Sequence, residues 1–160
     1  ISRAGREQAR LDSIAARERA VRDSVAAAAR ARDEAIAGAR AALTAPVFFD
    51  YDAAAIRDDS RDQLEAKLPL LTANPAVRLR VAGHTDERGS DEYNLALGQR
   101  RAASVKAFFA ERGVDAGRIE IVSFGKERPT CEQQDEACFS RNRRAEFEIT
   151  AGGESLSAPR

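Results

Sequence analysis

The sequence has no tryptophan, no methionine and a single histidine, His84, and aromatic residues make up 6% of its 160 residues. One histidine argues against metal sites that are built from several imidazoles. Basic and acidic residues both number 26, so the basic excess that is typical of nucleic-acid-binding domains is missing. No apolar run approaches the ~20 residues of a membrane-spanning helix. We therefore expect one ordinary domain with an added segment, without nucleic acid, metal or cofactor.

Cysteine is also scarce. Cys131 and Cys138 lie seven residues apart in the polar stretch TCEQQDEACFS. A zinc site would need more ligands than these two thiols. A local disulfide that closes a loop and a pair of free thiols both remain open, and we favour the disulfide. Paired cysteines would indicate an oxidising compartment.

The composition changes near Pro46. Residues 1–45 contain 16 alanines and many arginines, which are strong helix formers, so they predict one long helix. Glu18 and Arg32 interrupt its stripe of large apolar residues. The larger members of that stripe are Leu11, Ile14, Val21, Val25, Ile36 and Leu43. A coiled coil would sustain such a stripe over several heptads. Self-association and a solvated spacer helix therefore both remain open for residues 1–45.

Residues 46–150 alternate between strand and helix patterns. The order βαβαββ predicts an α/β (α+β) sandwich, in which a mixed sheet carries helices on one face. The predicted strands are 46–52, 77–83, 118–125 and the end of 141–150, and the predicted helices are 56–75 and 90–112. Residues 151–160, AGGESLSAPR, are polar and are expected to form a disordered tail.

Local signals refine the two predicted helices. Ser60 and Gln63 have the spacing of a capping box, and Pro69 is expected to kink or end the first helix. Gly113 has the position of a left-handed cap after the second helix. The core-facing side of that helix is expected to carry Leu95, Ala102, Val105 and Phe109.

A dense polar cluster separates the second predicted strand from its helix, within VAGHTDERGSDEYNLALGQRRAASV. Neither Ser90 nor Ser104 stands on a nucleophile elbow, which argues against a serine hydrolase. Asn94 and Arg101 are seven residues apart on one helix face, and Asp86 lies in the loop before that helix. One carboxylate and one guanidinium that meet in a crevice suit a zwitterionic ligand. We expect binding without catalysis, although a solvated Arg101 and a loop-capping Asp86 remain the simpler alternative.

Four segments resemble, in the same order, the OmpA-like peptidoglycan-binding domain, and most closely its branch of peptidoglycan-associated lipoproteins. These segments are VFFDYD, GHTDERGSDEYNLALGQRRAASVKAFF, GVDAGRIEIVSFGKERP and SRNRRAEFEI. The resemblance covers about residues 46–150. It implies an OmpA-like mixed sheet with helices. It also implies noncovalent binding of peptidoglycan through the meso-diaminopimelate of the stem peptide, whose side chain ends in an ammonium and a carboxylate.

The resemblance also implies roles for individual residues. Asp86 matches the carboxylate that binds the ammonium, Arg101 matches the carboxylate clamp, and Asn94 matches a further ligand contact. Arg143 matches a basic residue that closes the pocket, and Gly89 is expected to shape the loop with Thr85. The remaining matches, which act through backbone and ring contacts, are Phe49, Asp50, Tyr51 and Asp52.

The partners implied are the peptidoglycan stem peptide and the outer membrane, reached through an anchor upstream of Ile1. Proteins of the Tol system are further candidates, and residues 1–45 are a candidate for self-association. The expected location is the periplasm, at the outer membrane. The alternative is the periplasmic anchoring domain of a motor-stator-like or β-barrel protein, whose helical segment mediates protein contacts.

Overall fold

The computed structural model describes residues 1–158 and divides the chain into two compact units, Ile1–Ala37 and Gly38–Arg160. Helix α1, Arg3–Thr44, begins in the first unit and ends in the second. The predicted change at residue 46 stays a prediction, and the second compact unit also includes the last turns of α1. The reason is that Leu43, in the last turn of α1, is fully buried in the core of the second unit.

The first unit is a single helix without a core of its own. Its large apolar side chains are exposed, at 47% for Leu11, 61% for Val21 and 64% for Val25. Intrinsic propensity and local pairs such as Glu7–Arg10, at 2.6 Å, support the helix. Within residues 1–158, no helix combines the length and the apolar character needed to cross a membrane.

The second unit is built on a four-stranded mixed sheet in the order β1-β4-β2-β3. The strands are β1 Val47–Phe48, β2 Arg78–His84, β3 Ile119–Gly125 and β4 Arg144–Ala151. β2 and β3 are parallel, and β4 is antiparallel to both β1 and β2. The parallel pair requires a crossover connection, which the helix between β2 and β3 supplies.

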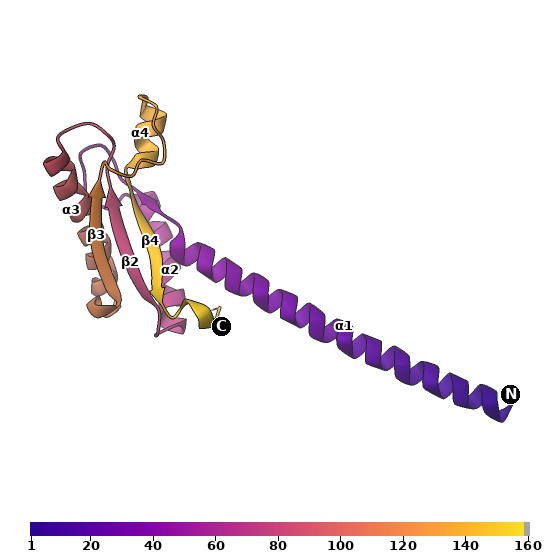
Figure 1. Ribbon diagram of the computed structural model, residues 1–160. Coiled ribbons are helices and arrows are strands. Elements are labelled where there is room, and N and C mark those ends of the chain that lie inside the picture. Colours follow the sequence, from indigo (N-terminus) through magenta and orange to yellow (C-terminus); the bar gives the residue numbers. More distant parts are fainter. Residues whose placement is uncertain (159–160) are drawn as a thin grey trace. The chain divides into compact units, whose positions relative to one another are not determined.

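Helices α2, Asp58–Ala73, and α3, Asp91–Glu111, lie on one face of the sheet (Figure 1). The predicted fold class is therefore confirmed. The predicted loop with the cysteines also contains a short helix, α4, Glu136–Asn142, at the end of the sheet where β4 begins (Figure 1). Two 3₁₀ turns, Ala116–Arg118 and Gly153–Ser155, complete the structure.

The core lies between the sheet and these two helices. Inward residues of β2, such as Leu79 and Val81, are fully buried. Ala102, Val105 and Phe109 of α3 are also fully buried, as predicted. The prediction for Leu95 is wrong, because its side chain is 38% exposed, whereas Leu97, two residues later, is buried.

One local prediction for α2 is wrong, and a second is narrowed. The helix begins at Asp58 after Arg57, so Ser60 lies inside it and is not its cap. The buried Ser60 hydroxyl instead donates to the Phe48 carbonyl at 2.7 Å and accepts from the Phe48 N–H at 3.2 Å. Of the two outcomes expected at Pro69, a kink or the end of the helix, the end is excluded, because the helix continues through Pro69 to Ala73.

The expected disorder of residues 151–160 is wrong for the part that the structure describes. Leu156 is only 4% exposed, and the Asn74 amide group holds Ser157 through two backbone hydrogen bonds of 2.7 and 2.8 Å. A single apolar residue in a polar stretch is a weak signal for packing, and the two bonds from Asn74 hold the chain next to Leu156. Residues 159–160 lie outside the described residues.

A buried lysine joins α2 to the end of α1 inside the second unit. The Lys67 ammonium donates to the carbonyls of Ala42, Leu43 and Ala45 at 2.7, 3.2 and 2.7 Å. It also lies 4.3 Å from the centre of the Phe147 ring. Burial lowers the pKa of Lys67 to about 7. Because the last carbonyls of a helix have no partner within it, Lys67 satisfies the end of α1.

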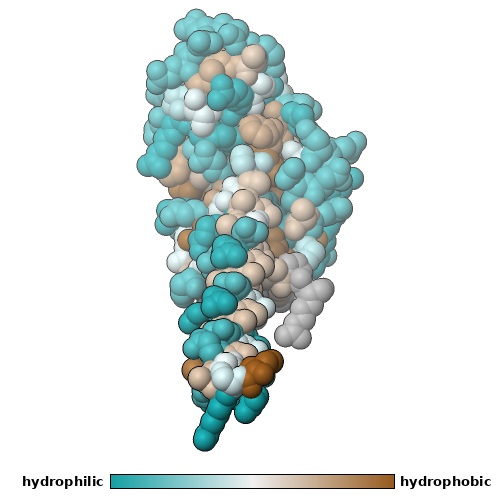
Figure 2. Space-filling model, turned by 90° about the vertical axis from the view of Figure 1, so that its right-hand side faces the viewer, coloured by the Kyte–Doolittle hydropathy of each residue, from teal (hydrophilic) through white to brown (hydrophobic). Residues whose placement is uncertain are grey.

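Hydrophilic residues predominate on the face of the molecule that Figure 2 shows, and apolar residues form small patches. In the second unit, the large apolar side chains that stay exposed are Tyr51, Tyr93 and Leu95. Both tyrosines line the same cavity, which is the candidate functional site.

Candidate functional site

A cavity of about 400 Å³ opens where β2 ends and the chain turns into α3. This volume is in the range of small-molecule sites. Its lining residues are Tyr51, Asp52, Thr85, Asp86, Arg88, Gly89, Ser90, Tyr93, Asn94, Leu97 and Arg101. Seven of the ten predicted site residues are among them. The other three, Phe49, Asp50 and Arg143, do not line it.

The loop between β2 and α3 gives the cavity its shape. Gly89 has a φ of +104°, which L side chains rarely adopt, so the predicted turn glycine is confirmed. Ser90 caps α3 by accepting from the Tyr93 N–H at 3.1 Å. The Asn94 amide, 2% exposed, donates to the Arg88 carbonyl at 3.0 Å. Thr85 fixes the start of the loop through its N–H, which donates to the Gly125 carbonyl at 2.9 Å.

Asp86 is the buried carboxylate of the cavity, at 4% exposure. It accepts three hydrogen bonds from Arg88, namely 2.7 Å from Nη2, 3.2 Å from Nε and 3.1 Å from the backbone N–H. Burial alone would raise the pKa of the Asp86 carboxyl, but these hydrogen bonds and the charges of Arg88 and Arg143 outweigh it and lower that pKa. Asp86 is therefore ionised at neutral pH.

Arg88 is the cation that the sequence reasoning did not assign to the site. Its guanidinium carbon lies 4.0 Å from the centre of the Tyr51 ring and 4.5 Å from that of the Phe139 ring. The side chain is nevertheless 36% exposed. The spacing of Asp86 and Arg88 was a local signal for their pairing. The two rings are far away in sequence, so nothing local indicated the stacking.

Arg101 borders the cavity but is fully buried, at 0% exposure. It donates to the backbone carbonyls of Ala53, His84 and Asp50 at 2.8, 2.9 and 3.0 Å. Burial lowers the pKa of Arg101 to about 10, so it remains a cation at neutral pH. Arg101 and Asp86 border the same cavity, but three of the five guanidinium N–H groups are already occupied by backbone.

Arg143 lies next to Asp86 but does not line the cavity. It is 5% exposed and donates to the Phe49 carbonyl and to Glu136 Oε1, both at 2.9 Å. Its Nη1 lies 3.5 Å from Asp86 Oδ2 and makes no hydrogen bond among the described residues. Phe49 and Asp50 thus act through their carbonyls, each of which accepts from a buried arginine.

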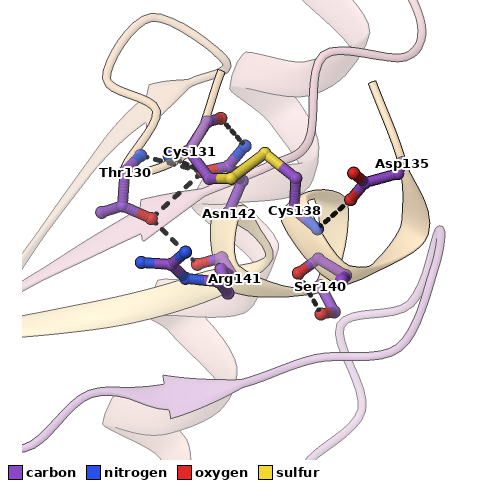
Figure 3. The surroundings of a disulfide bond; sticks show 8 residues. Thr130, Cys131, Asp135, Cys138, Ser140, Arg141 and Asn142 are labelled. Carbon is purple, nitrogen blue, oxygen red and sulfur yellow. Dashed lines mark hydrogen bonds between the residues drawn. A yellow bond between two sulfur atoms is a disulfide. The ribbon is translucent and has the colours of Figure 1, made fainter. Parts of the chain in front are cut away.

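The two cysteines form a disulfide, which confirms the favoured prediction (Figure 3). Cys131 and Cys138 have their Cα atoms 5.3 Å apart. Asp135 caps α4 by accepting from the Cys138 N–H at 2.8 Å. At the other end of α4, the Asn142 side chain bonds both backbone groups of Cys131, at 3.1 and 2.7 Å.

His84 does not line the cavity. Its buried ring lies 5.5 Å from the centre of the Phe124 ring, and its Nε2 lies 3.6 Å from Glu146 Oε2. Burial, with the positive charge of Arg144, lowers the pKa of His84 to about 4. Within residues 1–158 there is no cluster of three or more side chains that could hold a metal ion.

Comparisons with known proteins identify the family of the chain. The OmpA family matches residues 48–143. The peptidoglycan-associated lipoprotein of Haemophilus influenzae is 48% identical over 99 residues, which cover 62% of this chain and 65% of that protein. The chain thus covers slightly less than two thirds of that relative.

Solved structures show the same fold. The crystal structure of the peptidoglycan-associated lipoprotein from Burkholderia pseudomallei superposes with a TM-score of 0.64 at 39% identity, covering 66% of this chain and 89% of that one. The C-terminal domain of Helicobacter pylori MotB gives a TM-score of 0.60 at 21% identity, covering 66% and 83%, and shows the fold alone. Because the family match extends over more than half of the residues, the chain belongs to the OmpA family.

Proposed function

We propose that the chain binds peptidoglycan noncovalently, by holding the meso-diaminopimelate of the stem peptide in the cavity around Asp86. The observation that carries the proposal is that the buried carboxylate of Asp86 and the guanidinium groups of Arg88 and Arg101 border a single cavity of about 400 Å³. The end of the diaminopimelate side chain has the complementary pair, one ammonium and one carboxylate. In this proposal the site holds its ligand without changing it.

In this proposal, Asp86 takes the ammonium through a charge-assisted hydrogen bond. Arg88 and Arg101 face the carboxylate from two sides. Arg88 is 36% exposed and can turn its planar edge to the ligand, whereas Arg101 offers only the N–H groups that its three backbone bonds leave free. Tyr51 and Tyr93, both exposed at the rim, give apolar surface to the methylene chain between the two ends.

The proposed role is to anchor the outer membrane to the cell wall from the periplasm. The name of the Haemophilus relative supports the ligand and the anchoring. The Cys131–Cys138 disulfide supports an oxidising compartment. Each contact can be weak, because many tethered copies on one polymer rebind at high effective concentration.

Calorimetric titration of soluble muropeptides tests the proposal. We expect Asp86→Asn to lose about 2–5 kcal/mol of binding free energy, the usual result of removing one partner of a buried charge contact. Asp91→Asn is the matched control, since that carboxylate is 75% exposed and does not line the cavity. A stem peptide with lysine in place of diaminopimelate lacks the second carboxylate and should bind clearly more weakly. Equal affinity for the two stem peptides would contradict the proposal.

A further inference from the structure

Helix α4 is short but held at both ends. The Cys131–Cys138 bond and the Asp135 cap fix its first turn (Figure 3). The Asn142 side chain fixes its last turn, by accepting from the N–H groups of Thr130 and Cys131 at 2.8 and 3.1 Å. A seven-residue helix does not persist by itself in water. These ties therefore determine where the side chains of α4 lie.

Two of those side chains reach the arginines that flank Asp86. The Phe139 ring lies 4.5 Å from the guanidinium carbon of Arg88. Glu136 accepts from Arg143 Nη2 at 2.9 Å, and its second oxygen lies 3.8 Å from Arg88 Nη2. Neither Phe139 nor Glu136 lines the cavity. Any effect of α4 on the ligand must therefore pass through the two arginines.

We propose that the disulfide-tethered helix α4 is the positioning element of the ligand site, holding Arg88 and Arg143 on Asp86, so that opening the Cys131–Cys138 bond weakens ligand binding. The inference rests on the proposed function for its effect on binding, but not for its effect on Asp86. A guanidinium that is already stacked and aimed needs less ordering when the ligand arrives. When α4 moves, Arg88 loses its contact with the Phe139 ring, and Arg143 loses its hydrogen bond to Glu136.

The rest of the domain does not depend on this bond. The disulfide joins two residues that are only seven positions apart, and the four hydrogen bonds of the Asn142 side chain to Thr130 and Cys131 do not involve its sulfur atoms. Its opening is thus a local event at one end of the sheet. A dithiol reductant supplies the two electrons and two protons, so that the S–S bond becomes two thiols and the reductant becomes a disulfide.

The first test needs no ligand. Carbon NMR titration of the Asp86 carboxyl is run on the oxidised chain, on the chain in dithiothreitol, and on the double variant Cys131→Ser with Cys138→Ser. Arg88, Arg143, Arg101, Asp52 and Glu136 are the charged groups near it. We expect its apparent pKa to rise toward the ordinary value in both opened forms, because the bonds from Arg88 hold it down. An unchanged Asp86 titration in both overturns the inference.

The second test measures muropeptide affinity. Phe139→Leu should weaken muropeptide binding about three- to tenfold, the range expected when a cation–π contact is lost. Phe139→Tyr keeps an aromatic ring and should bind like the parent chain. Phe124→Leu is the matched control, because that half-buried ring also carries an arginine, Arg128 at 3.6 Å, which does not touch Asp86. Equal losses for Phe139→Leu and Phe124→Leu contradict positioning. No muropeptide binding by the oxidised parent chain refutes the proposed function, while the Asp86 titration still decides the role of α4.

Discussion

Each side of the cavity carries an arginine, and the two arginines differ in burial and in bonding partners. On the α3 side, formed by β2 and α3, Arg101 is fully buried and its N–H groups bond three backbone carbonyls. On the α4 side, formed by the loop after β2 and supported by α4, whose residues do not line the cavity, Arg88 is 36% exposed and contacts the Tyr51 and Phe139 rings and Asp86. One arginine is thus enclosed by backbone carbonyls, while the other stays partly accessible to solvent.

The largest expected effect is on the α3 side. Arg101→Ala should lower the free energy of unfolding by about 3–5 kcal/mol, because it leaves the carbonyls of Asp50, Ala53 and His84 without a donor and creates a large void. Arg101→Lys keeps the charge but cannot donate in three directions from a planar group, so it should lose less. Urea unfolding of both variants measures this. If Arg101→Ala were as stable as the parent chain, Arg101 would not support the fold more than Arg88 does.

The next effect concerns the contact that joins β2 to α3. A methyl group on Gly83 would lie 1.7 Å from the Gly98 carbonyl oxygen, which is backbone and cannot move aside. We expect Gly83→Ala to destabilise the domain by about 2–3 kcal/mol through overpacking. Gly38→Ala is the control, since nothing lies within 4 Å of its added carbon. A similar small effect of both changes on the unfolding midpoint would show that the α3 side is less tightly packed than the structure indicates.

The regular elements could be predicted from the sequence because their signals are local. The alternation in β2, Ser90 before α3 and Gly113 after it are each readable within a few residues, and the structure has both caps, with a φ of +89° at Gly113. Helix α4 was not predicted, because its two turns are too short to show a periodic pattern of apolar residues. Ser60 was misassigned because its hydroxyl bonds Phe48, a partner outside its own helix.

Most of the residues that line the cavity could be predicted from the sequence, but the contacts that each of them makes could not. The motif indicated Asp86, Arg101 and Asn94, and all three line the cavity. Whether an arginine faces a ligand or a backbone carbonyl depends on chain segments that are distant in sequence. The loop at residues 50–53 takes two of the bonds from Arg101, and Tyr51 and Phe139 stack on Arg88. These contacts exist only once the sheet has brought the segments together.

A pH dependence should also arise on the α3 side, at His84, whose carbonyl accepts from Arg101. The folded pKa of His84 is about 4, below its ordinary value of 6.5, so the unfolded chain takes up the proton first. Stability should therefore fall as the pH decreases from about 6.5 toward about 4, by at most about 3 kcal/mol. Urea unfolding at pH 7 and 4.5 measures the loss. His84→Phe should remove most of the difference, and an equal loss in that variant would assign it to other groups.

The smallest expected effect on stability, and the sharpest contrast with Arg101→Ala, is that of Arg88→Gln. The pair with Asp86 is partly solvated on the Arg88 side, and such pairs contribute about 0–1 kcal/mol. Arg143 stays near Asp86, so the carboxylate is not left alone. Unfolding by urea should therefore hardly change, while muropeptide affinity falls, because the exposed carboxylate contact of the proposed site is gone. A variant that loses stability but keeps its affinity would exchange the roles of the two arginines, with Arg88 supporting the loop and Arg101 binding the ligand.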